Sequence, residues 1–165
     1  MRYSVRVPAA GVAAAAGFAC WVIGSYGMNR HGPWHPVNLI AHLAWRGAPT
    51  GSGFSAPATA VGLAIVLAAG IVMIVPFAAL AYGAGLPAPA TVLGAAVYTN
   101  AAWIIGDYIV WPKLDSVGAH GFSPGVAWLG HIVAGVAAGV VLVARPGLLR
   151  PAVRRLGSAP TRPGG

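Results

Sequence analysis

The chain contains almost no acidic residues. Among its 165 residues there are 2 Asp+Glu, namely Asp107 and Asp115, and only 7% of all residues are charged. A soluble domain normally carries about 25% charged residues, so this chain cannot cover a folded core with a water-facing surface. A lipid-facing surface needs no such charges, and 58% of the residues are hydrophobic. The sequence therefore predicts a membrane protein with a single domain.

Features that mark several other classes of protein are also scarce. The only cysteine, Cys20, lies inside an apolar run, so no disulfide can form within the chain. There is no HExxH or CxxC motif and no phosphate-binding or dinucleotide-binding glycine fingerprint. The net charge of +8 comes mostly from arginines near the two ends of the chain, where membrane topology places them. We therefore expect neither an enzyme nor a nucleic-acid-binding protein, and we predict no cofactor.

Four apolar segments are long enough to cross a bilayer. A transmembrane helix needs roughly 20 apolar residues to cross the ~30 Å hydrocarbon core. The four segments are residues 7–28, 58–82, 89–111 and 124–144. The predicted fold class is all-α, an integral membrane four-helix bundle formed by residues 1–144. Residues 145–165, which are rich in Arg, Pro and Gly, are predicted to form a basic, disordered cytoplasmic tail.

The distribution of Lys and Arg predicts the orientation of the spans, because cytoplasmic loops carry an excess of these residues. The N-terminus supplies two and the tail five, seven in all, whereas the opposite side supplies Arg30, Arg46 and Lys113. We expect both termini in the cytoplasm. The Ala-, Gly- and Arg-rich composition is typical of a GC-rich bacterial genome, which favours a bacterial inner membrane. A cleaved signal peptide is the alternative for the first span, but the apolar run is longer than usual for one.

Small residues at helical spacing predict where the helices pack, because they let backbones approach closely in lipid. The first span carries such a stripe, formed by Ala13, Gly17, Cys20, Gly24 and Gly27. The fourth span carries Gly135 and Gly139. The second span is almost purely aliphatic and is predicted to face lipid. The glycine-rich faces would also serve to join partner membrane subunits or a second copy of the chain in a homo-oligomer.

The loop between the first two spans contains a predicted short amphipathic helix, residues 36–46. At 100° per residue, its polar side chains share one arc and its apolar side chains fill the other. The polar arc consists of His35, Asn38, His42, Trp45 and Arg46. Because Trp34 and Trp45 lie at its ends, the helix is expected at the outer membrane interface.

Asp107 is the only acid inside a predicted span, where an ionisable side chain is costly enough to suggest a function. His131 lies at similar depth on the fourth span, so we expect a hydrogen bond between them. The predicted polar cluster at the outer face comprises Asp107, His131, His35, Asn38 and His42. It would bind a proton, a cation or a small solute in transport or sensing. Alternatively, these residues only hold helices together, as buried polar pairs commonly do, in an accessory or scaffolding subunit.

The histidines supply metal-ligand types without a metal-ligand pattern. Zinc needs three or four ligands at ~2.0–2.2 Å, and ligand pairs on a helix are spaced three or four residues apart. His35 and His42 are seven residues apart, which is about 10 Å along a helix. We therefore predict no metal site. The side chains that would supply one are His35, His42, His120 and His131.

Two stretches resemble segments of uncharacterised bacterial four-span inner-membrane proteins. They are Gly32–His42, GPWHPVNLIAH, and Trp111–Pro112 followed by Gly121–His131, GFSPGVAWLGH. In those proteins a short interfacial helix follows the first span, and a helix with an HxxxG pattern closes the bundle. The resemblance implies this fold and layout, and it implies no particular chemistry.

Overall fold

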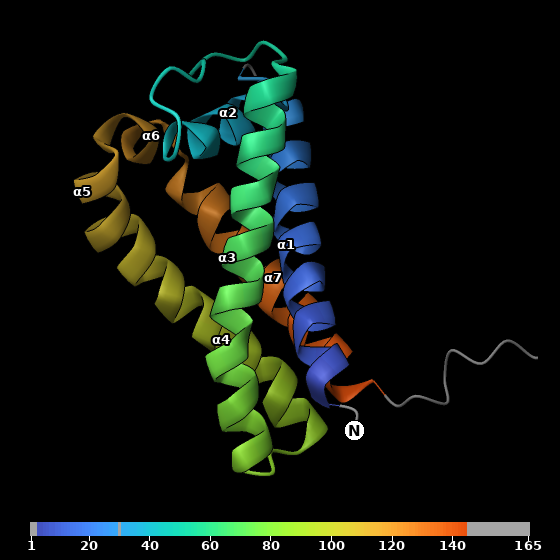
Figure 1. The fold of residues 1–165 in the computed structure, drawn as a ribbon. Coiled ribbons are helices and arrows are strands. Elements are labelled where there is room, and N and C mark those ends of the chain that lie inside the picture. Colours follow the sequence, from blue (N-terminus) through green and yellow to red (C-terminus); the bar gives the residue numbers. More distant parts are fainter. Residues whose placement is uncertain (1–2, 30, 145–165) are drawn as a thin grey trace, which may run out of the picture.

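The fold is a bundle of long helices (Figure 1), seen in a computed structural model that describes residues 3–29 and 31–144. The helices are α1 (Tyr3–Gly27), α2 (His35–His42), α3 (Ala56–Gly83), α4 (Ala88–Ile105), η1 (Gly106–Val110), α5 (Trp111–Leu114), α6 (Ser116–Gly121) and α7 (Pro124–Val143). There is no strand among the described residues. Four helical segments are long and apolar enough to cross a membrane: Val5–Gly27, Ala56–Gly83, Ala88–Leu114 and Pro124–Val143. The predicted all-α membrane bundle is confirmed.

The bundle has two distinct ends, visible in Figure 1. We call the end formed by α2, α5 and α6 the α2 end. The first residues of α1, the last residues of α7 and the short loop between α3 and α4 lie at the opposite end. Several predictions concern residues outside the described part of the chain: the tail 145–165, and Arg2 and Arg30 of the charge count.

Helix α7 is the central element, since it packs against both α1 and α4. Glycines make the second contact possible: a methyl group on Gly135 would lie 2.5 Å from Cα of Ala96, and one on Gly139 would lie 2.7 Å from Cα of Val92. On α1, Gly17 of the predicted stripe lies against α7, but Cys20 and Gly24 are exposed. The packing prediction is therefore right for α7 and only partly right for α1.

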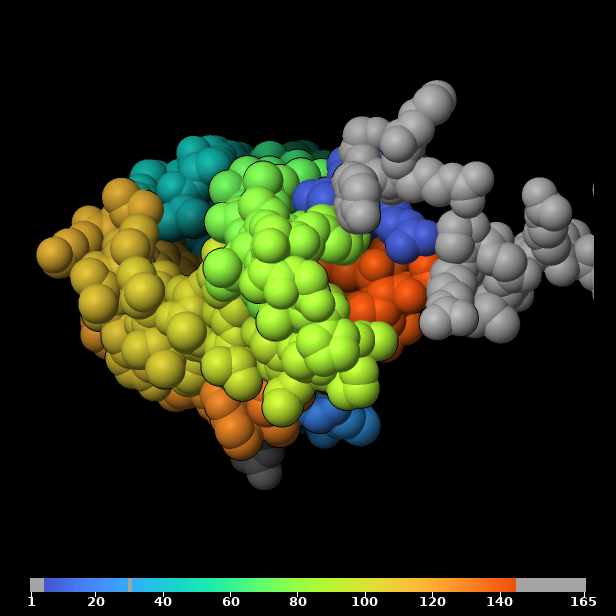
Figure 2. Space-filling view, turned by 90° about the horizontal axis from the view of Figure 1, so that it is seen from below, coloured from blue at the N-terminus to red at the C-terminus, as the bar shows by residue number. Residues whose placement is uncertain are grey.

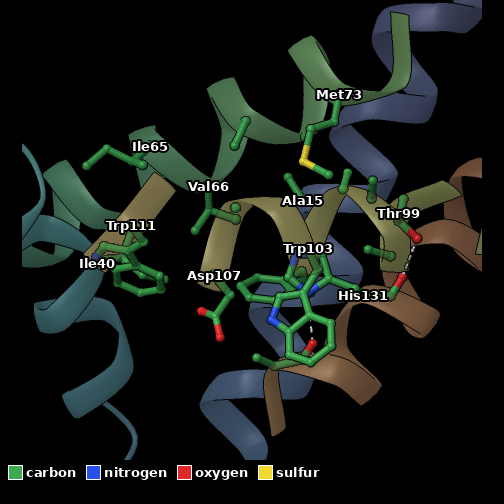
Figure 3. A pocket seen from close by; sticks show the side chains of 18 of the residues that line it. Ala15, Ile40, Ile65, Val66, Met73, Thr99, Trp103, Asp107, Trp111 and His131 are labelled. Carbon is green, nitrogen blue, oxygen red and sulfur yellow. Dashed lines mark hydrogen bonds between the residues drawn. The ribbon is translucent and has the colours of Figure 1, made fainter. Parts of the chain in front are cut away.

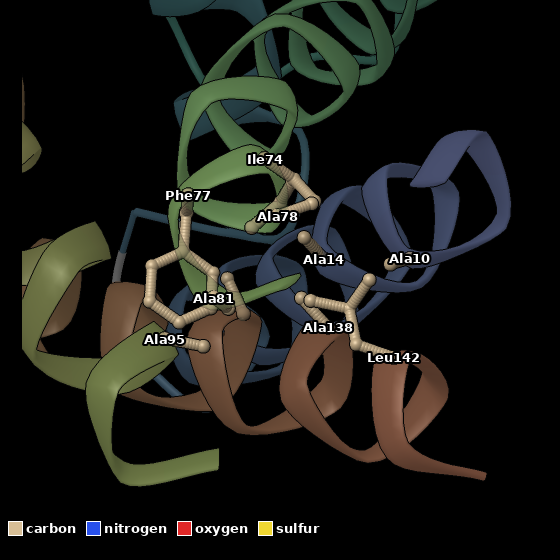
Figure 4. Packing of buried hydrophobic residues seen from close by; sticks show 10 residues of the cluster. Ala10, Ala14, Ile74, Phe77, Ala78, Ala81, Ala95, Ala138 and Leu142 are labelled. Carbon is tan, nitrogen blue, oxygen red and sulfur yellow. The ribbon is translucent and has the colours of Figure 1, made fainter. Parts of the chain in front are cut away.

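The prediction that the second span only faces lipid is wrong. α3 packs against α1, where a methyl group on Gly70 would lie 2.7 Å from the carbonyl oxygen of Gly11. It also contributes Ile74, Phe77 and Ala78 to a core of mostly small side chains from four helices (Figure 4). In a membrane the core and the lipid are both apolar, so an aliphatic sequence does not reveal which of the two a helix face contacts.

Helices α3 and α4 touch near the end opposite α2 and then diverge. The Phe77 ring lies 5.5 Å from the Tyr98 ring, and it packs beside Gly94. Figure 2, which views the molecule from this end, shows the two helices (green to yellow-green) in contact. Towards the α2 end, α4 leans away from α3 (Figure 1). This divergence leaves room inside the bundle beneath α2.

The third span contains a π-helical turn, Gly106–Val110, which the sequence did not predict. A π-turn accommodates an extra residue and changes which side chains share a face. Regular α-helical spacing would put Asn100, Ile104, Asp107 and Trp111 along one face. Instead, Ile104 is 51% exposed on the outside of the bundle, whereas Asp107 and Trp111 point inwards.

Helix α2 lies across its end of the bundle and is packed against it. It covers His35–His42, not 36–46, and Pro36 to Ala41 are all buried. Asn38 is fully buried, and its Nδ2 donates hydrogen bonds to the carbonyls of Gly51 and Gly53, at 2.9 and 3.0 Å. Of the predicted polar arc, Asn38 therefore anchors the loop before α3. The loop that contains Gly51 and Gly53 folds back over α2, and its carbonyl groups accept the two hydrogen bonds of the Asn38 amide.

Candidate functional site

A cavity of about 280 Å³ lies inside the bundle, beneath α2 and between α3 and α4 (Figure 3). Most of its wall is apolar, with Ile65, Val66 and Met73 of α3 on one side. Two titratable side chains line it, Asp107 from η1 and His131 from α7. The structure thus brings together the two members of the predicted polar cluster that lie on apolar, span-length segments.

Asp107 lines this cavity (Figure 3), and the interaction recorded for its carboxyl group comes from its own helical segment, from the Trp103 side chain. Its Oδ1 is buried and has no hydrogen-bond partner among the described residues, and the same holds for Nε1 of Trp103, one turn earlier. No described residue of the cavity lining is Lys or Arg. Most buried polar atoms in proteins are hydrogen-bonded, so an acceptor and a donor left unpaired in one cavity need an explanation.

His131 is held by its own helix and by aromatic neighbours. Its Nδ1 donates to the Ala127 carbonyl at 2.8 Å, and its ring lies 4.8 Å from the Phe18 ring and 6.2 Å from the Trp103 ring. Because a carbonyl can only accept, Nδ1 carries the hydrogen, and Nε2 of the neutral ring is an acceptor. The backbone around His131 is fixed too, since Thr99 donates to its carbonyl at 2.7 Å.

The predicted hydrogen bond between Asp107 and His131 is absent among the described residues. The Ala127 carbonyl already takes the Nδ1 proton of His131. Asp107 also belongs to the π-turn, which points its side chain in a different direction from the one that a regular α-helix would give it. The two side chains therefore face one cavity without forming a pair.

A second polar group lies at the α2 end and centres on Asp115. Its Oδ2 accepts from Nδ1 of His42 at 2.8 Å, and its Oδ1 lies 2.8 Å from NH1 of Arg46. The Gly118 backbone N–H also donates to Oδ1, at 3.2 Å, so Asp115 caps the start of α6. The Arg46 guanidinium additionally contacts the Leu114 carbonyl. This ion-paired group, His42–Asp115–Arg46, ties α2 to the segment between α5 and α6.

The surroundings of Asp115 favour its charged form. Burial by itself would raise the pKa of this carboxyl group. The hydrogen bonds from His42 and Gly118 and the charges of His42 and Arg46 oppose that effect and hold the pKa below its ordinary value of 3.8. In the sequence, Asp115 lies between the third and fourth predicted spans and belongs to no predicted site. The Asp-Ser-x-Gly sequence suggests a helix cap, but no spacing connects Asp115 with His42, 73 residues earlier.

The other predicted residues of the cluster lie apart from the cavity. The His35 ring stacks on the His31 ring at 5.1 Å and lies 5.6 Å from Tyr26, at the α2 end of α1. His120, which was considered only as a metal ligand, is exposed and donates from Nδ1 to the Ser116 carbonyl at 2.6 Å. Asn38 anchors a loop, as described above. The predicted cluster of five therefore divides into a cavity pair, an ion-paired histidine and two packing residues.

Metal-ligand side chains do not gather anywhere in 3–29 and 31–144. No group of three or more His, Cys, Asp or Glu in this part of the chain is placed to hold a metal ion. His35, His42, His120 and His131, the candidate ligands, have separate partners.

No family model, curated protein or solved structure matches the chain. Any function of the cavity must therefore be argued from its own side chains.

One further sequence pattern has no catalytic geometry. Residues 121–125 read Gly-Phe-Ser-Pro-Gly and fit the Gly-x-Ser-x-Gly pattern of hydrolases. In those enzymes the serine sits on a turn between a strand and a helix. Ser123 instead precedes α7 after the short helix α6, and its backbone N–H donates to the Tyr26 hydroxyl at 2.7 Å. The pattern here marks the beginning of a transmembrane helix.

Proposed function

We propose that this protein binds a small solute or cation in the cavity around Asp107, as a transport or sensing protein of a bacterial inner membrane. The observation that carries the proposal is the Asp107 carboxyl group in a mostly apolar cavity, whose Oδ1 has no hydrogen-bond partner among the described residues. An ionisable group inside a membrane is costly, and such groups typically serve ions, protons or ligands. With both termini in the cytoplasm, the α2 end and the cavity would lie towards the periplasm.

The alternative, an accessory or scaffolding subunit, requires Asp107 to hold the bundle together. Other polar side chains do this in the described structure. Trp21 donates to the Val126 carbonyl at 3.0 Å, and Thr99 donates to the His131 carbonyl at 2.7 Å. Asp107 makes no such bond to a neighbouring helix, so its position is better explained by a ligand than by packing.

Thermal unfolding of purified variants tests this proposal. An unpaired carboxylate in apolar surroundings costs free energy. Asp107→Asn and Asp107→Leu should therefore leave the melting temperature unchanged or raise it, as removal of a functional but strained group often does. Thr99→Val is the matched control; it deletes a real interhelical hydrogen bond, so it should lower the unfolding free energy by about 0.6–1 kcal/mol.

The opposite result would favour the scaffolding role. If both Asp107 variants destabilise the protein as much as Thr99→Val does, Asp107 is part of the packing and the proposed binding site loses its basis.

A further inference from the structure

The cavity around Asp107 is bounded by two helices that do not close over it. Met73 and Val66 of α3 line one side, and Val110 and Leu114 of η1 and α5 line the other. Val110 and Leu114 are 44% and 56% exposed although they line the cavity, so they form its rim. Both sides belong to segments apolar enough to span a membrane. In a bilayer this opening faces hydrocarbon, so a ligand would reach the cavity sideways from the lipid.

The polar groups in the cavity favour a ligand that donates hydrogen bonds and carries positive charge. Asp107 provides a carboxyl group, and His131, in its neutral form, provides an acceptor at Nε2. The Trp103 side chain lies beside Asp107 and interacts with its carboxyl group. No described lining residue supplies a compensating positive charge. A buried carboxylate is stabilised when a cation pairs with it.

Aromatic rings near Asp107 favour a cation as well. Trp103 and Phe18 line the cavity beside His131, and Trp111 and Phe122 line it closer to α2. The face of an aromatic ring attracts an ammonium group, most strongly when that ring is Trp. The remaining wall is aliphatic and suits an apolar chain.

We propose that the ligand is a lipophilic amine: a protonated amine on an apolar body that moves between α3 and α4 from the bilayer. This inference rests on the proposed function and names the ligand class of the same cavity. The ammonium group would pair with Asp107 beside Trp103, and the apolar body would lie along α3. A fatty acid would place a second carboxylate beside Asp107, a quinone offers only acceptors, and an alcohol leaves the Asp107 charge uncompensated.

Binding of radiolabelled decylamine to the full chain in lipid nanodiscs tests the inference. Saturable binding is measured in competition with unlabelled decylamine, decanol and decanoate, which share one chain length and differ in the head group. We expect decylamine to compete best. Asp107→Asn should weaken its binding by about tenfold or more, because hydrogen bonds to charged groups are among the strongest. Asp107→Glu should restore part of the affinity.

A pair of tryptophan variants locates the bound amine. Met73 lines the cavity, whereas Val72, the preceding residue, is 69% exposed on the outer surface of the same helix. Met73→Trp should fill the cavity and abolish saturable binding, and Val72→Trp should leave it intact.

Several results would overturn the inference. Equal loss of binding in Val72→Trp and Met73→Trp would place the amine on the lipid-facing surface. Decanol or decanoate that competes as well as decylamine, with no effect of Asp107→Asn, would show that the cavity binds another class of ligand, and the proposed function would survive. Absence of saturable amine binding to the wild-type protein would also reject the amine, and the thermal unfolding of the Asp107 variants would then decide the proposed function alone.

Discussion

The two acids of the chain lie in opposite surroundings. Asp115 receives hydrogen bonds from His42 and Gly118 and an ion pair from Arg46, whereas Oδ1 of Asp107 has no partner among the described residues. A buried carboxylate is stable when its acceptor capacity is used. Asp115 therefore supports the fold at the α2 end. Under the proposed function, the unused acceptor of Asp107 would bind a ligand.

The role of Asp115 in the fold predicts a characteristic dependence of stability on pH. Because its folded-state pKa lies below the ordinary 3.8, its contribution is fully present above pH 3.8 and is lost as the pH falls through the lower folded-state value. Asp115→Asn should therefore lower the unfolding free energy at neutral pH by about 1–3 kcal/mol. The difference from wild type should shrink below pH 3.8, as measured by denaturant unfolding in detergent micelles.

Arg46→Ala provides the comparison for Asp115→Asn. The Arg46 side chain is 54% exposed, so its ion pair is screened by water and its loss should cost at most about 1 kcal/mol. If Asp115→Asn and wild type keep a constant difference at every pH, ionisation of Asp115 does not contribute to stability.

Contacts between helices depend on single glycines rather than on the whole small-residue stripe. Gly135 is buried, and a methyl group there would lie 2.5 Å from Cα of Ala96 and 2.6 Å from the Ala95 carbonyl oxygen. Gly24 belongs to the predicted stripe of α1, but a methyl group there would meet nothing within 4 Å. The two positions share residue type and helical backbone, and they differ only in what lies next to them.

Alanine substitutions at these two glycines should therefore have opposite effects on stability. Gly135→Ala forces α7 away from α4 and should lower the unfolding free energy by about 1–3 kcal/mol, as overpacked cores do. Gly24→Ala should leave stability unchanged or raise it by about 0.5–1 kcal/mol, because Ala favours a helix more than Gly does. Equal effects at both sites, measured by thermal unfolding, would mean that α4 and α7 are not held by close backbone contact.

The long helices could be predicted from the sequence because each is a continuous apolar run that ends at polar or turn-forming residues. The details that shape the cavity could not. The π-turn at Gly106–Val110 directs Asp107 into the cavity, but no residue pattern in that segment predicts a π-turn. Likewise, the polar arc of α2 does not reveal what it faces, and Asn38 turns out to be covered by the 51–53 loop. Both features depend on contacts with distant parts of the chain, which local periodicity does not contain.

The whole molecule is polarised along its long axis. The α2 end holds His35 and His42 of α2, His31 stacked on His35, His120 of α6, and Asp115 between α5 and α6. Asp107 and His131 line the cavity beneath α2. Below the cavity, the helices are joined by a core of small apolar side chains. The described molecule thus has an open half, in which α3 and α4 diverge, and a closed half, in which Phe77 joins them. Under the proposed function, the open half would bind the ligand and the closed half would hold the fold.

The expected orientation of this polarised molecule can be tested by cysteine labelling. Cys20 is replaced by Ala, and a single cysteine is then placed at Thr50, in the exposed loop after α2, or at Ala84, in the turn after α3. These two positions lie at opposite ends of the bundle (Figure 1). Because basic residues are retained on the cytoplasmic side, a membrane-impermeant maleimide added to intact bacterial cells should label Thr50→Cys. Ala84→Cys should react only after the cells are permeabilised.

The reverse pattern would place the α2 end in the cytoplasm, so the cavity would then lie nearer to the cytoplasmic leaflet. Labelling of both positions in intact cells would contradict a bundle that spans the membrane, because it requires both ends of α3 to lie outside.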